Sequence, residues 1–384
     1  MSTTTARAIV CSEPGADHIP GTNWQLQDIS VPIELKDGEL LVEMVASGIC
    51  HTDLITGSLP PGMPGVQYPR VVGHEGSGYV KAVGPNVTKD VKAGDPVLLS
   101  FDYCGQCESC QRGHPAYCAA FFPMNLFGVA DVFKSKDGSQ GIAGKHFGHS
   151  SFASLSVVNQ TTVLPAKDLV KSKEELQLFA PLGCGLQTGA GAILNMAKPD
   201  KKDRVMVLGL GGVGLAAVMA AKICECEQII AVDRVKSRIE MSKELGATHG
   251  FDTTGVEDLT AAFKEVTGGL GPTVVLDTTG FLPIVQASYD SLGSRGCFVW
   301  IGANMDPAYT LNISIGTFMT NGTRMLGCME GDSVPHEFIP QLIKYYREGK
   351  FPIEKIAKYY KAEEFKRALH ESHTGESIKP IITW

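Results

Sequence analysis

The sequence contains no run of about 18 apolar residues, which is the length that a membrane-spanning helix requires, so no such helix is predicted. It also lacks an excess of positive charge, because 34 lysines and arginines stand against 41 aspartates and glutamates and leave a net charge of −7. A surface of that sign neither neutralises the phosphates of a nucleic acid nor is attracted to anionic lipids. These absences argue against nucleic acids and membranes as partners.

No targeting signal is recognisable in the sequence. The first eighteen residues hold one arginine and only a short apolar stretch, Ala8–Cys11, which is too brief for a secretory signal. The terminal segment Pro380–Trp384 carries no lipidation motif. We therefore expect a cytoplasmic protein, in which eleven cysteines do not indicate disulfides.

The composition is that of a globular protein with more than one domain. Of the 384 residues, 43% are hydrophobic and 20% are charged, which excludes a mainly disordered chain. At ~150 residues per domain, the length suggests two to three domains. The 43 glycines follow no three-residue period, which excludes a collagen-like fibre.

The pattern of apolar residues differs between two parts of the chain. Up to about residue 165, short apolar runs bounded by glycine, proline or Asp-Gly predict a β-rich domain, for example at 40–45, 77–83 and 96–100. From about residue 170, apolar strands alternate with helices, a pattern that predicts a doubly wound parallel sheet. The strands are expected at 204–208, 228–232, 273–276 and 297–301, and the helices at 173–179, 189–196, 215–224 and 237–245. A helix at 338–347 and a strand at 378–384 follow, and this last strand is free to return to the first domain.

A glycine-rich segment follows the strand at 204–208. The residues VLGLGGVGL place Gly209, Gly211 and Gly214 in the pattern G-x-G-x-x-G, where a strand ends and a helix begins. In dinucleotide-binding folds these glycines make a tight turn, admit the pyrophosphate and let helix and strand pack closely. Asp233, at the end of the next strand, can accept hydrogen bonds from the adenosine ribose and repel a 2′-phosphate, whereas Arg234 could pair with that phosphate. The pattern favours NAD over NADP, and a glycine-rich turn without a ligand is the alternative.

Four cysteines fall within fifteen residues. Cys104, Cys107, Cys110 and Cys118 have the spacing C-x2-C-x2-C-x7-C. Four thiolates close a tetrahedral zinc site with no open position, and such sites stabilise loops that lack a core of their own. An iron–sulfur cluster prefers a last gap of three residues followed by proline, whereas here the gap is seven and Ala119 follows. The spacing favours a structural zinc over an iron–sulfur cluster or four free thiols.

Three further segments carry residues that can bind a metal: GICHTD at 48–53, GHEG at 73–76 and LGCG at 182–185. An open catalytic zinc site needs three protein ligands, and two cysteines with one histidine form such a set. Each segment by itself is a weak signal, because a lone buried cysteine such as Cys184 is more often a small hydrophobic residue.

The order of these motifs carries more information than any one of them. GICHTD, GHEGSGYVKAVGPNV, CGQCESC with Cys118, PLGCGLQTGAGA and GLGGVGL together resemble the zinc-dependent medium-chain alcohol dehydrogenases. The resemblance runs from about residue 30 to the C-terminal GESIKPIITW. Within that family, SFDYCGQCESCQRGHPAYC, PLGCGLQTGAGA and FIPQLIKYYREGKFP are most similar to the aryl (benzyl) alcohol dehydrogenases.

The resemblance implies two zinc ions per subunit, one structural and one catalytic. The implied catalytic zinc ligands are Cys50, His74 and Cys184, with Glu75 able to approach the metal. Zinc there acts as a Lewis acid on the substrate oxygen. The resemblance also implies that Thr52 hydrogen-bonds the substrate oxygen and that Asp53 orients His74.

The resemblance also implies NAD as the cofactor. The implied contacts are His51, Thr188, Gly209, Gly211, Gly212, Val213, Gly214, Asp233, Arg238 and Lys379. His51 and Lys379 correspond to residues that face the pyrophosphate, Thr188 and Val213 to nicotinamide contacts, and Arg238 to a basic residue at the adenosine ribose.

Three positions depart from the family pattern. Ile55 stands where some members have the histidine that ends a proton relay, so a relay from Thr52 would have to end on His51 or on water. A purely electrostatic contact of His51 with phosphate is the alternative. Lys379 stands where an arginine often clamps the pyrophosphate, and lysine lacks the bidentate fork. Ser100 stands where a bulky aromatic residue often narrows the substrate pocket, which would leave room for a ring.

The predicted fold class is α/β: a β-rich GroES-like catalytic domain, residues 1–185 plus 329–384, with an inserted Rossmann domain of doubly wound parallel sheet, residues 186–328. We expect the active site in the cleft between these domains. The expected protein is a homodimer or homotetramer that transfers a hydride between NAD(H) and a primary allylic or aromatic alcohol or aldehyde.

Two other functions remain as alternatives. A glutathione-adduct (formaldehyde-type) dehydrogenase would need a basic site, which the apolar loop 121–129 does not offer. A non-catalytic zinc-binding structural protein is disfavoured because the chain retains the metal ligands.

Overall fold

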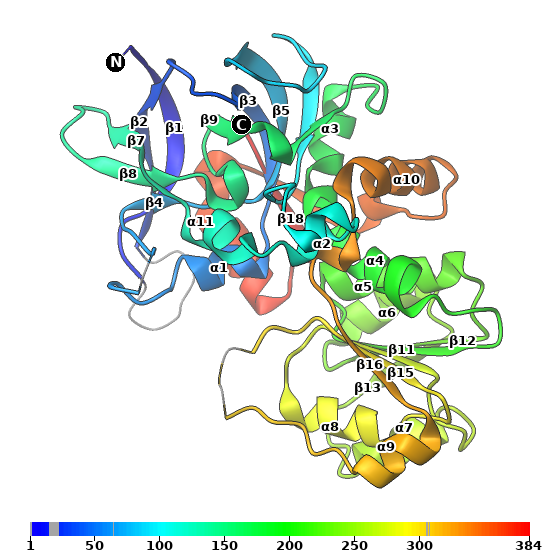
Figure 1. The fold of residues 1–384 in the computed structure, drawn as a ribbon. Helices are drawn as coiled ribbons and strands as arrows, with labels where there is room; N and C mark the ends of the chain where they lie inside the picture. Colours follow the sequence, from blue (N-terminus) through cyan, green and yellow to red (C-terminus); the bar gives the residue numbers. More distant parts are fainter. Residues whose placement is uncertain (1, 15–22, 64, 305, 307) are drawn as a thin grey trace. The chain divides into compact units, whose positions relative to one another are not determined.

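The computed structural model describes residues 2–14, 23–63, 65–304, 306 and 308–384 (Figure 1). It contains two compact units, the first formed by Met1–Gly185, Val334–Ile343 and Ile353–Trp384, and the second by Leu186–Ser333 and Lys344–Pro352. The domain limits at 185/186 and 328/329 stay a prediction, and these units differ from them by placing 329–333 and 344–352 in the second unit. No helix among the described residues is long and apolar enough to cross a membrane.

The described residues form strands, helices and short 3₁₀ or π turns. The strands are β1 (Thr3–Cys11), β2 (Trp24–Pro32), β3 (Glu39–Gly48), β4 (Arg70–Val71), β5 (Glu75–Val83), β6 (Pro96–Leu99), β7 (Val129–Ser135), β8 (Gly141–Gly144), β9 (Leu155–Asn159), β10 (Val163–Pro165), β11 (Arg204–Leu208), β12 (Gln228–Asp233), β13 (His249–Asp252), β14 (Val274–Asp277), β15 (Cys297–Trp300), β16 (Arg324–Gly327), β17 (Ala357–Lys361) and β18 (Lys379–Thr383). The helices are α1 (His51–Thr56), α2 (Glu108–Gln111), α3 (Lys173–Phe179), α4 (Gly185–Gly191), α5 (Gly212–Ile223), α6 (Lys236–Leu245), α7 (Leu259–Glu265), α8 (Leu282–Asp290), α9 (Ile315–Asn321), α10 (Pro335–Arg347) and α11 (Phe365–Thr374). The turns cover Pro115–Tyr117, Pro123–Phe127, His146–Gly148, Gln160–Thr162, Ala180–Gly183, Ala192–Ala197, Glu330–Asp332, Ile353–Lys355 and Ala362–Glu364.

The first unit is built from a closed barrel, β1-β2-β7-β8-β4, and a second sheet in the order β10-β6-β5-β3-β18-β17, with β9 also paired to β3. Strand β3 is buried on both faces because its side chains alternate between two cores: Leu41 belongs to the barrel core, and Leu40, Val42 and Met44 to the other. The C-terminal β18 pairs with β3, as the sequence predicts for a returning strand.

The second unit is a six-stranded, all-parallel sheet in the order β13-β12-β11-β14-β15-β16. Its central strands are almost entirely apolar, for example VVLD in β14, where all four residues are buried, as expected for strands covered on both faces. The chain crosses from one side of β11 to the other after β13, so the strand order reverses between β11 and β14. In sheets of this kind, ligands bind beyond the carboxyl ends of the strands at that reversal.

Helix α10 begins at Pro335, three residues before the predicted start at 338, and two helices near the candidate functional residues also begin earlier than the sequence predicts. Helix α5 starts at Gly212 instead of Leu215, because Gly211 adopts the extended conformation of an N-cap (φ −74°, ψ −170°) and starts the helix inside the glycine loop. Helix α4 starts at Gly185 instead of Gly189 and continues into the π turn Ala192–Ala197. Both helices therefore begin directly at candidate functional residues.

Candidate active site

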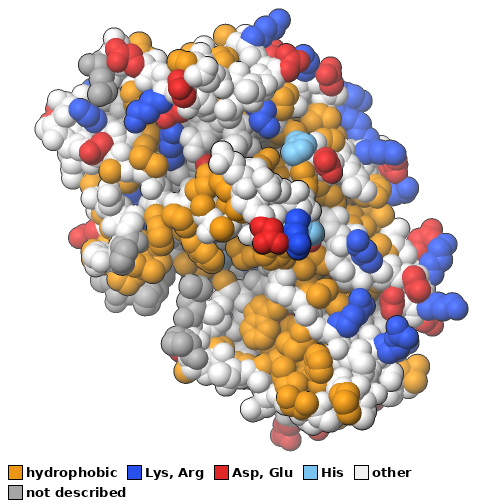
Figure 2. Space-filling model, in the orientation of Figure 1, with side chains coloured by type: hydrophobic (Ala, Val, Ile, Leu, Met, Phe, Trp, Pro, Cys, Tyr) orange, Lys and Arg blue, Asp and Glu red, His pale blue; other side chains and the backbone are white. Residues whose placement is uncertain are grey.

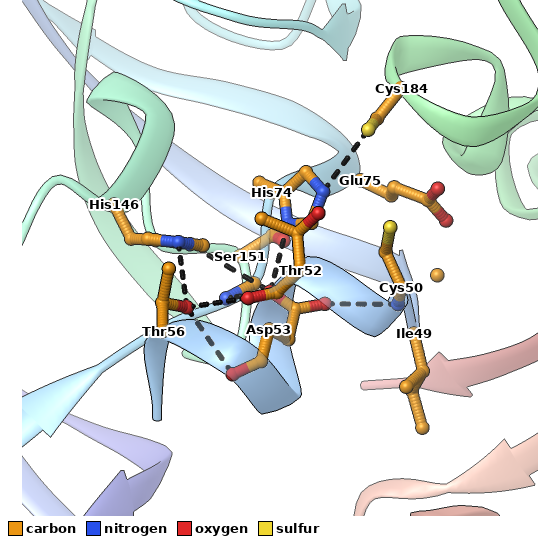
Figure 3. A network of polar contacts seen from close by, with 12 residues as sticks. Ile49, Cys50, Thr52, Asp53, Thr56, His74, Glu75, His146, Ser151 and Cys184 are labelled. Atoms are coloured by element: carbon orange, nitrogen blue, oxygen red, sulfur yellow. Dashed lines mark hydrogen bonds and ion pairs between the residues drawn. The ribbon is translucent and has the colours of Figure 1, made fainter. Parts of the chain in front are cut away.

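The side chains of Cys50, His74 and Cys184 meet in the first unit (Figure 3). Cys50 is the extended N-cap of α1, His74 lies directly before β5, and Cys184 follows the turn Ala180–Gly183. Their two sulfur atoms and one ring nitrogen lie within 4.8 Å of one another, and His74 Nε2 is 3.1 Å from Cys184 Sγ. The topology thus brings together three ligand atoms from segments that are far apart in the chain.

Asp53 determines how His74 is oriented. Its Oδ1 lies 2.8 Å from His74 Nδ1 and accepts the Gly73 N–H at 2.9 Å, while Oδ2 accepts the Cys50 N–H at 3.0 Å. One fully buried carboxylate therefore binds both ligand-bearing segments. Because Nδ1 donates to Asp53, Nε2 is the nitrogen that faces the two sulfurs.

The electrostatics of the cluster suit a metal cation. A hydrogen bond from Cys184 lowers the pKa of Cys50 well below its usual value, although burial opposes the shift, and His74 acts in the same direction as Cys184. Burial acts to lower the pKa of His74, but Asp53 and Cys50 raise it well above its usual value. Zinc binds thiolate sulfur and imidazole nitrogen, and a set of three such ligands leaves an exchangeable fourth position. The residues present therefore fit a catalytic zinc.

Glu75 and Lys379 form a buried ion pair beside this cluster. Lys379 Nζ donates to both carboxylate oxygens of Glu75 at 3.0 Å and to the Ile49 carbonyl at 3.3 Å, so each of its three N–H groups has an acceptor. Glu75 Oε1 also accepts the Gly185 N–H at 3.0 Å. The expected pyrophosphate contact of Lys379 stays a prediction, and the structure instead directs this side chain to Glu75.

The two residues of the expected proton relay, His51 and Thr52, lie in the first turn of α1. His51 is exposed and Thr52 is half-buried. Ile55, one turn further on, is half-buried and apolar, so it cannot carry a proton. The relay from Thr52 to His51 stays a prediction.

His146 and Phe147 also lie beside the site, and the sequence did not single them out. His146 Nε2 is 3.1 Å from Thr56 Oγ1, and its Nδ1 is 3.7 Å from Asp53 Oδ1. Burial and the neighbouring His74 lower the pKa of His146 well below its usual value. Phe147 stacks on the His74 ring, with centroids 4.3 Å apart. The motif HFGH at 146–149 is the only hint in the sequence, and it matches no ligand spacing.

An aromatic cluster extends from Phe147. Phe121 lies 6.1 Å from Phe147 and 5.8 Å from Phe101, measured between ring centroids. Ser100 is buried and donates its hydroxyl to the Gly183 carbonyl at 2.6 Å, so it ties β6 to the turn before Cys184. Phe147 thus makes the surroundings of the candidate zinc ligand His74 apolar on the side that its ring covers.

The sulfur atoms of Cys104, Cys107, Cys110 and Cys118 also lie within 4.8 Å of one another. Backbone N–H groups point at them, for example from Cys107 to Cys104 Sγ at 3.4 Å. Such bonds from Ala119 and Cys110 lower the pKa of Cys107 to about 6. Burial raises the pKa of Cys110 to about 12 and also raises the pKa of Cys118. Four converging thiols fit a closed structural zinc site, because zinc takes thiolates as ligands and displaces their protons when it binds.

The glycine loop of the second unit has the expected backbone. Gly209 has φ +84°, and a Cβ at Gly214 would lie 1.8 Å from the Gly209 carbonyl oxygen, so neither position tolerates a side chain. Gly212 and Val213 form the first turn of α5, whose free N–H groups can bind a pyrophosphate. A Cβ at Gly189 would lie 1.9 Å from the Val213 carbonyl, so α4, with Thr188, packs directly against this loop.

Asp233 lies at the end of β12, next to the glycine loop. Its Oδ2 accepts the Leu210 N–H at 2.7 Å, and its Oδ1 accepts the N–H groups of Arg234 and Val235 at 2.7 and 2.9 Å. Arg238 Nη1 lies 3.9 Å from the same carboxylate. The structure thus places Asp233 and Arg238 together, beside the turn where the dinucleotide pattern predicts the adenosine ribose.

Known proteins share both the sequence and the fold. Residues 36–171 match the family model described as alcohol dehydrogenase GroES-like domain, and residues 212–346 match zinc-binding dehydrogenase. Geraniol dehydrogenase of Castellaniella defragrans is 35% identical over 363 residues, covering 93% of this chain and 92% of that protein. The crystal structure of benzyl alcohol dehydrogenase from Acinetobacter calcoaceticus has a TM-score of 0.87 and 37% identity, covering 99% of both chains. A zinc-binding-domain alcohol dehydrogenase from Burkholderia ambifaria has a TM-score of 0.90 and 37% identity, covering 100% and 99%. Together with the two clusters of metal ligands, these matches show that the chain belongs to the zinc-dependent medium-chain alcohol dehydrogenases.

Proposed function

We propose that this alcohol dehydrogenase uses NAD and acts on primary allylic or aromatic alcohols and the corresponding aldehydes. The observation that carries the proposal is the aromatic cluster Phe101, Phe121 and Phe147, one ring of which stacks on the candidate zinc ligand His74. The three rings are buried and make the surroundings of His74 aromatic, which favours a substrate that carries a ring or a double bond. Relatives named geraniol dehydrogenase and benzyl alcohol dehydrogenase support this substrate class.

The residues of the chain have distinct parts in this reaction. When bound, zinc polarises the alcohol oxygen and NAD takes up the hydride. Asp53 keeps His74 in the tautomer whose Nε2 faces the metal position. We assign to the Thr52 hydroxyl the role of accepting the proton that the alcohol loses while it gives up its own, with His51 as the exposed group through which the released proton reaches water. Phe147 keeps water from the His74 ring.

Substrate preference provides the first test. We expect kcat/KM for benzyl and cinnamyl alcohol to exceed that for 1-propanol by about 100-fold, because a buried ring adds both apolar area and ring stacking. Phe147→Leu should reduce this ratio about tenfold, while Phe263→Leu, in the core of the second unit, serves as the control for a lost ring. Equal rates on short aliphatic alcohols would contradict the aromatic assignment, and activity confined to glutathione adducts would support the alternative dehydrogenase.

Cofactor preference tests the role of Asp233. In Asp233→Ala, NAD loses its ribose acceptor and a 2′-phosphate is no longer repelled, so we expect the NAD-over-NADP ratio of kcat/KM to fall about 100-fold. Asp252→Ala is the matched control, because Asp252 ends the neighbouring β13 at the same edge of the sheet. A wild-type enzyme that prefers NADP would refute the assignment of NAD.

We also propose a homodimer or homotetramer in the cytoplasm. In the part of the chain that the structure describes, β16 pairs only with β15, so its outer edge is open. Nearby α9 exposes Ile315 (81%) and Met319 (73%), and Figure 2 shows hydrophobic side chains gathered where Figure 1 draws α8 and α9. Exposed apolar area of this kind often marks a surface that contacts another protein chain. A mass measurement under native conditions tests the proposal by counting the subunits, and a monomer would contradict it.

A further inference from the structure

A strained turn follows the last strand of the parallel sheet. Glu330, Gly331 and Asp332 all have left-handed backbone, with φ of 49°, 69° and 46°. Non-glycine residues adopt this conformation only at a cost in free energy, and consecutive examples occur where the surrounding structure imposes them. A Cβ on Gly331 would lie 2.4 Å from the Gln187 carbonyl, so the turn is pressed against α4.

The first residue of this turn places a buried carboxylate inside the second unit. Glu330 is only 8% exposed, and its Oε2 accepts hydrogen bonds from Gln187 Nε2 at 3.4 Å and Thr188 Oγ1 at 3.5 Å. The Ser333 hydroxyl donates to the Glu330 carbonyl at 2.7 Å, and Asn195 Nδ2 donates to the Gly331 carbonyl at 3.0 Å. The turn is therefore held firmly, and the acid group at its start has a defined position.

The topology places this carboxylate at one end of the expected dinucleotide site. Asp233 follows β12 on one side of β11, whereas β14, β15 and β16 lie on the other side. With its pyrophosphate on the first turn of α5 and its adenosine ribose at Asp233, a dinucleotide extends its nicotinamide half toward the carboxyl ends of β14 to β16. The Glu330 turn follows β16. Thr188, which donates a hydrogen bond to Glu330, directly precedes Gly189, and Gly189 packs against the Val213 carbonyl at the start of α5.

We propose that Glu330 is a positioning residue that makes the site bind the oxidised nicotinamide more tightly than the reduced one. The inference rests on the proposed use of NAD. The nicotinamide ring carries a positive charge only in NAD+, so a buried carboxylate nearby attracts the oxidised ring and leaves the neutral ring of NADH almost unaffected. Glu330 thereby stabilises the complex with NAD+ relative to the complex with NADH, while the overall equilibrium of the reaction stays unchanged.

Calorimetric titration of Glu330→Gln with NAD+, NADH and ADP-ribose tests the proposal. We expect the Kd for NAD+ to rise about tenfold, with the Kd values for NADH and ADP-ribose within about twofold of wild type. Glu330→Asp retains the charge and should keep the wild-type ratio of the two Kd values. Asp332→Asn is the matched control, since it removes a carboxylate from the same turn.

The outcomes separate this inference from the proposed cofactor. A parallel loss of NAD+ and NADH binding would assign Glu330 a merely structural role and overturn the inference, as would an unchanged Kd for NAD+. Failure of the wild-type protein to bind either NAD+ or ADP-ribose would instead refute the proposed use of NAD. If Glu330→Gln does not fold, Glu330→Ser offers a smaller neutral side chain, and the same ratio of Kd values decides.

Discussion

Replacing Cys184 with serine is expected to remove almost all turnover while leaving the fold intact. Cys184 Sγ lies 3.1 Å from His74 Nε2 in the cluster with Cys50, and a serine hydroxyl stays protonated at neutral pH, so it is a poor zinc ligand. A Lewis acid contributes several kcal/mol to such a reaction, so kcat should fall by at least about 1,000-fold. Metal analysis should find one zinc per subunit instead of two, and the unfolding temperature should change little.

Cys11→Ser is the matched control for this prediction. Cys11 is also a buried thiol of the first unit, but it lies in the barrel core and outside both metal-ligand clusters. Its serine variant should keep its zinc and its turnover. Full activity of Cys184→Ser with two zinc ions per subunit would show that Cys184 is not a ligand.

Replacing Cys107 with serine should have the opposite profile, with a large loss of stability and little change in the turnover of folded protein. The segment 104–118 contains only the short α2 and the turn Pro115–Tyr117, so converging thiols are its main source of order. Structural zinc contributes directly to folding, and we expect the unfolding temperature to fall by at least about 5 °C, together with the soluble yield.

Gln106→Ser, at an exposed neighbouring position, is the control for Cys107→Ser and should behave as wild type. The kcat of purified Cys107→Ser, normalised to its remaining catalytic zinc, should stay within about twofold of wild type. If Cys107→Ser instead abolished turnover in a stable protein and Cys184→Ser mainly lowered stability, the assignment of the two zinc sites would have to be exchanged.

Local patterns in the sequence predict much of the second unit. Strands β11, β12, β14 and β15 are predicted within one or two residues, because strands buried on both faces are short, apolar and bounded by polar residues or glycine. The glycine loop is equally local, since the strand, all three glycines and the start of the helix lie within eleven consecutive residues, 204–214. The first unit is harder to predict, because the barrel strands β1 and β2 have irregular burial patterns and pair with strands far away in the sequence, which short apolar runs do not reveal.

The sequence by itself therefore determined the sites whose members are neighbours in the chain: the four cysteines of 104–118 and the glycine loop with Asp233 one strand later. The Cys50–His74–Cys184 set could be named only through the family resemblance, because His74 and Cys184 are separated by 110 positions. Only the tertiary structure decided which groups these residues meet. Lys379 binds Glu75 because β18 pairs with β3, Phe147 covers His74 from a left-handed turn, and Glu330 reaches Thr188 across 142 positions. Contacts of this kind depend on strand order and backbone handedness, which a one-dimensional pattern does not contain.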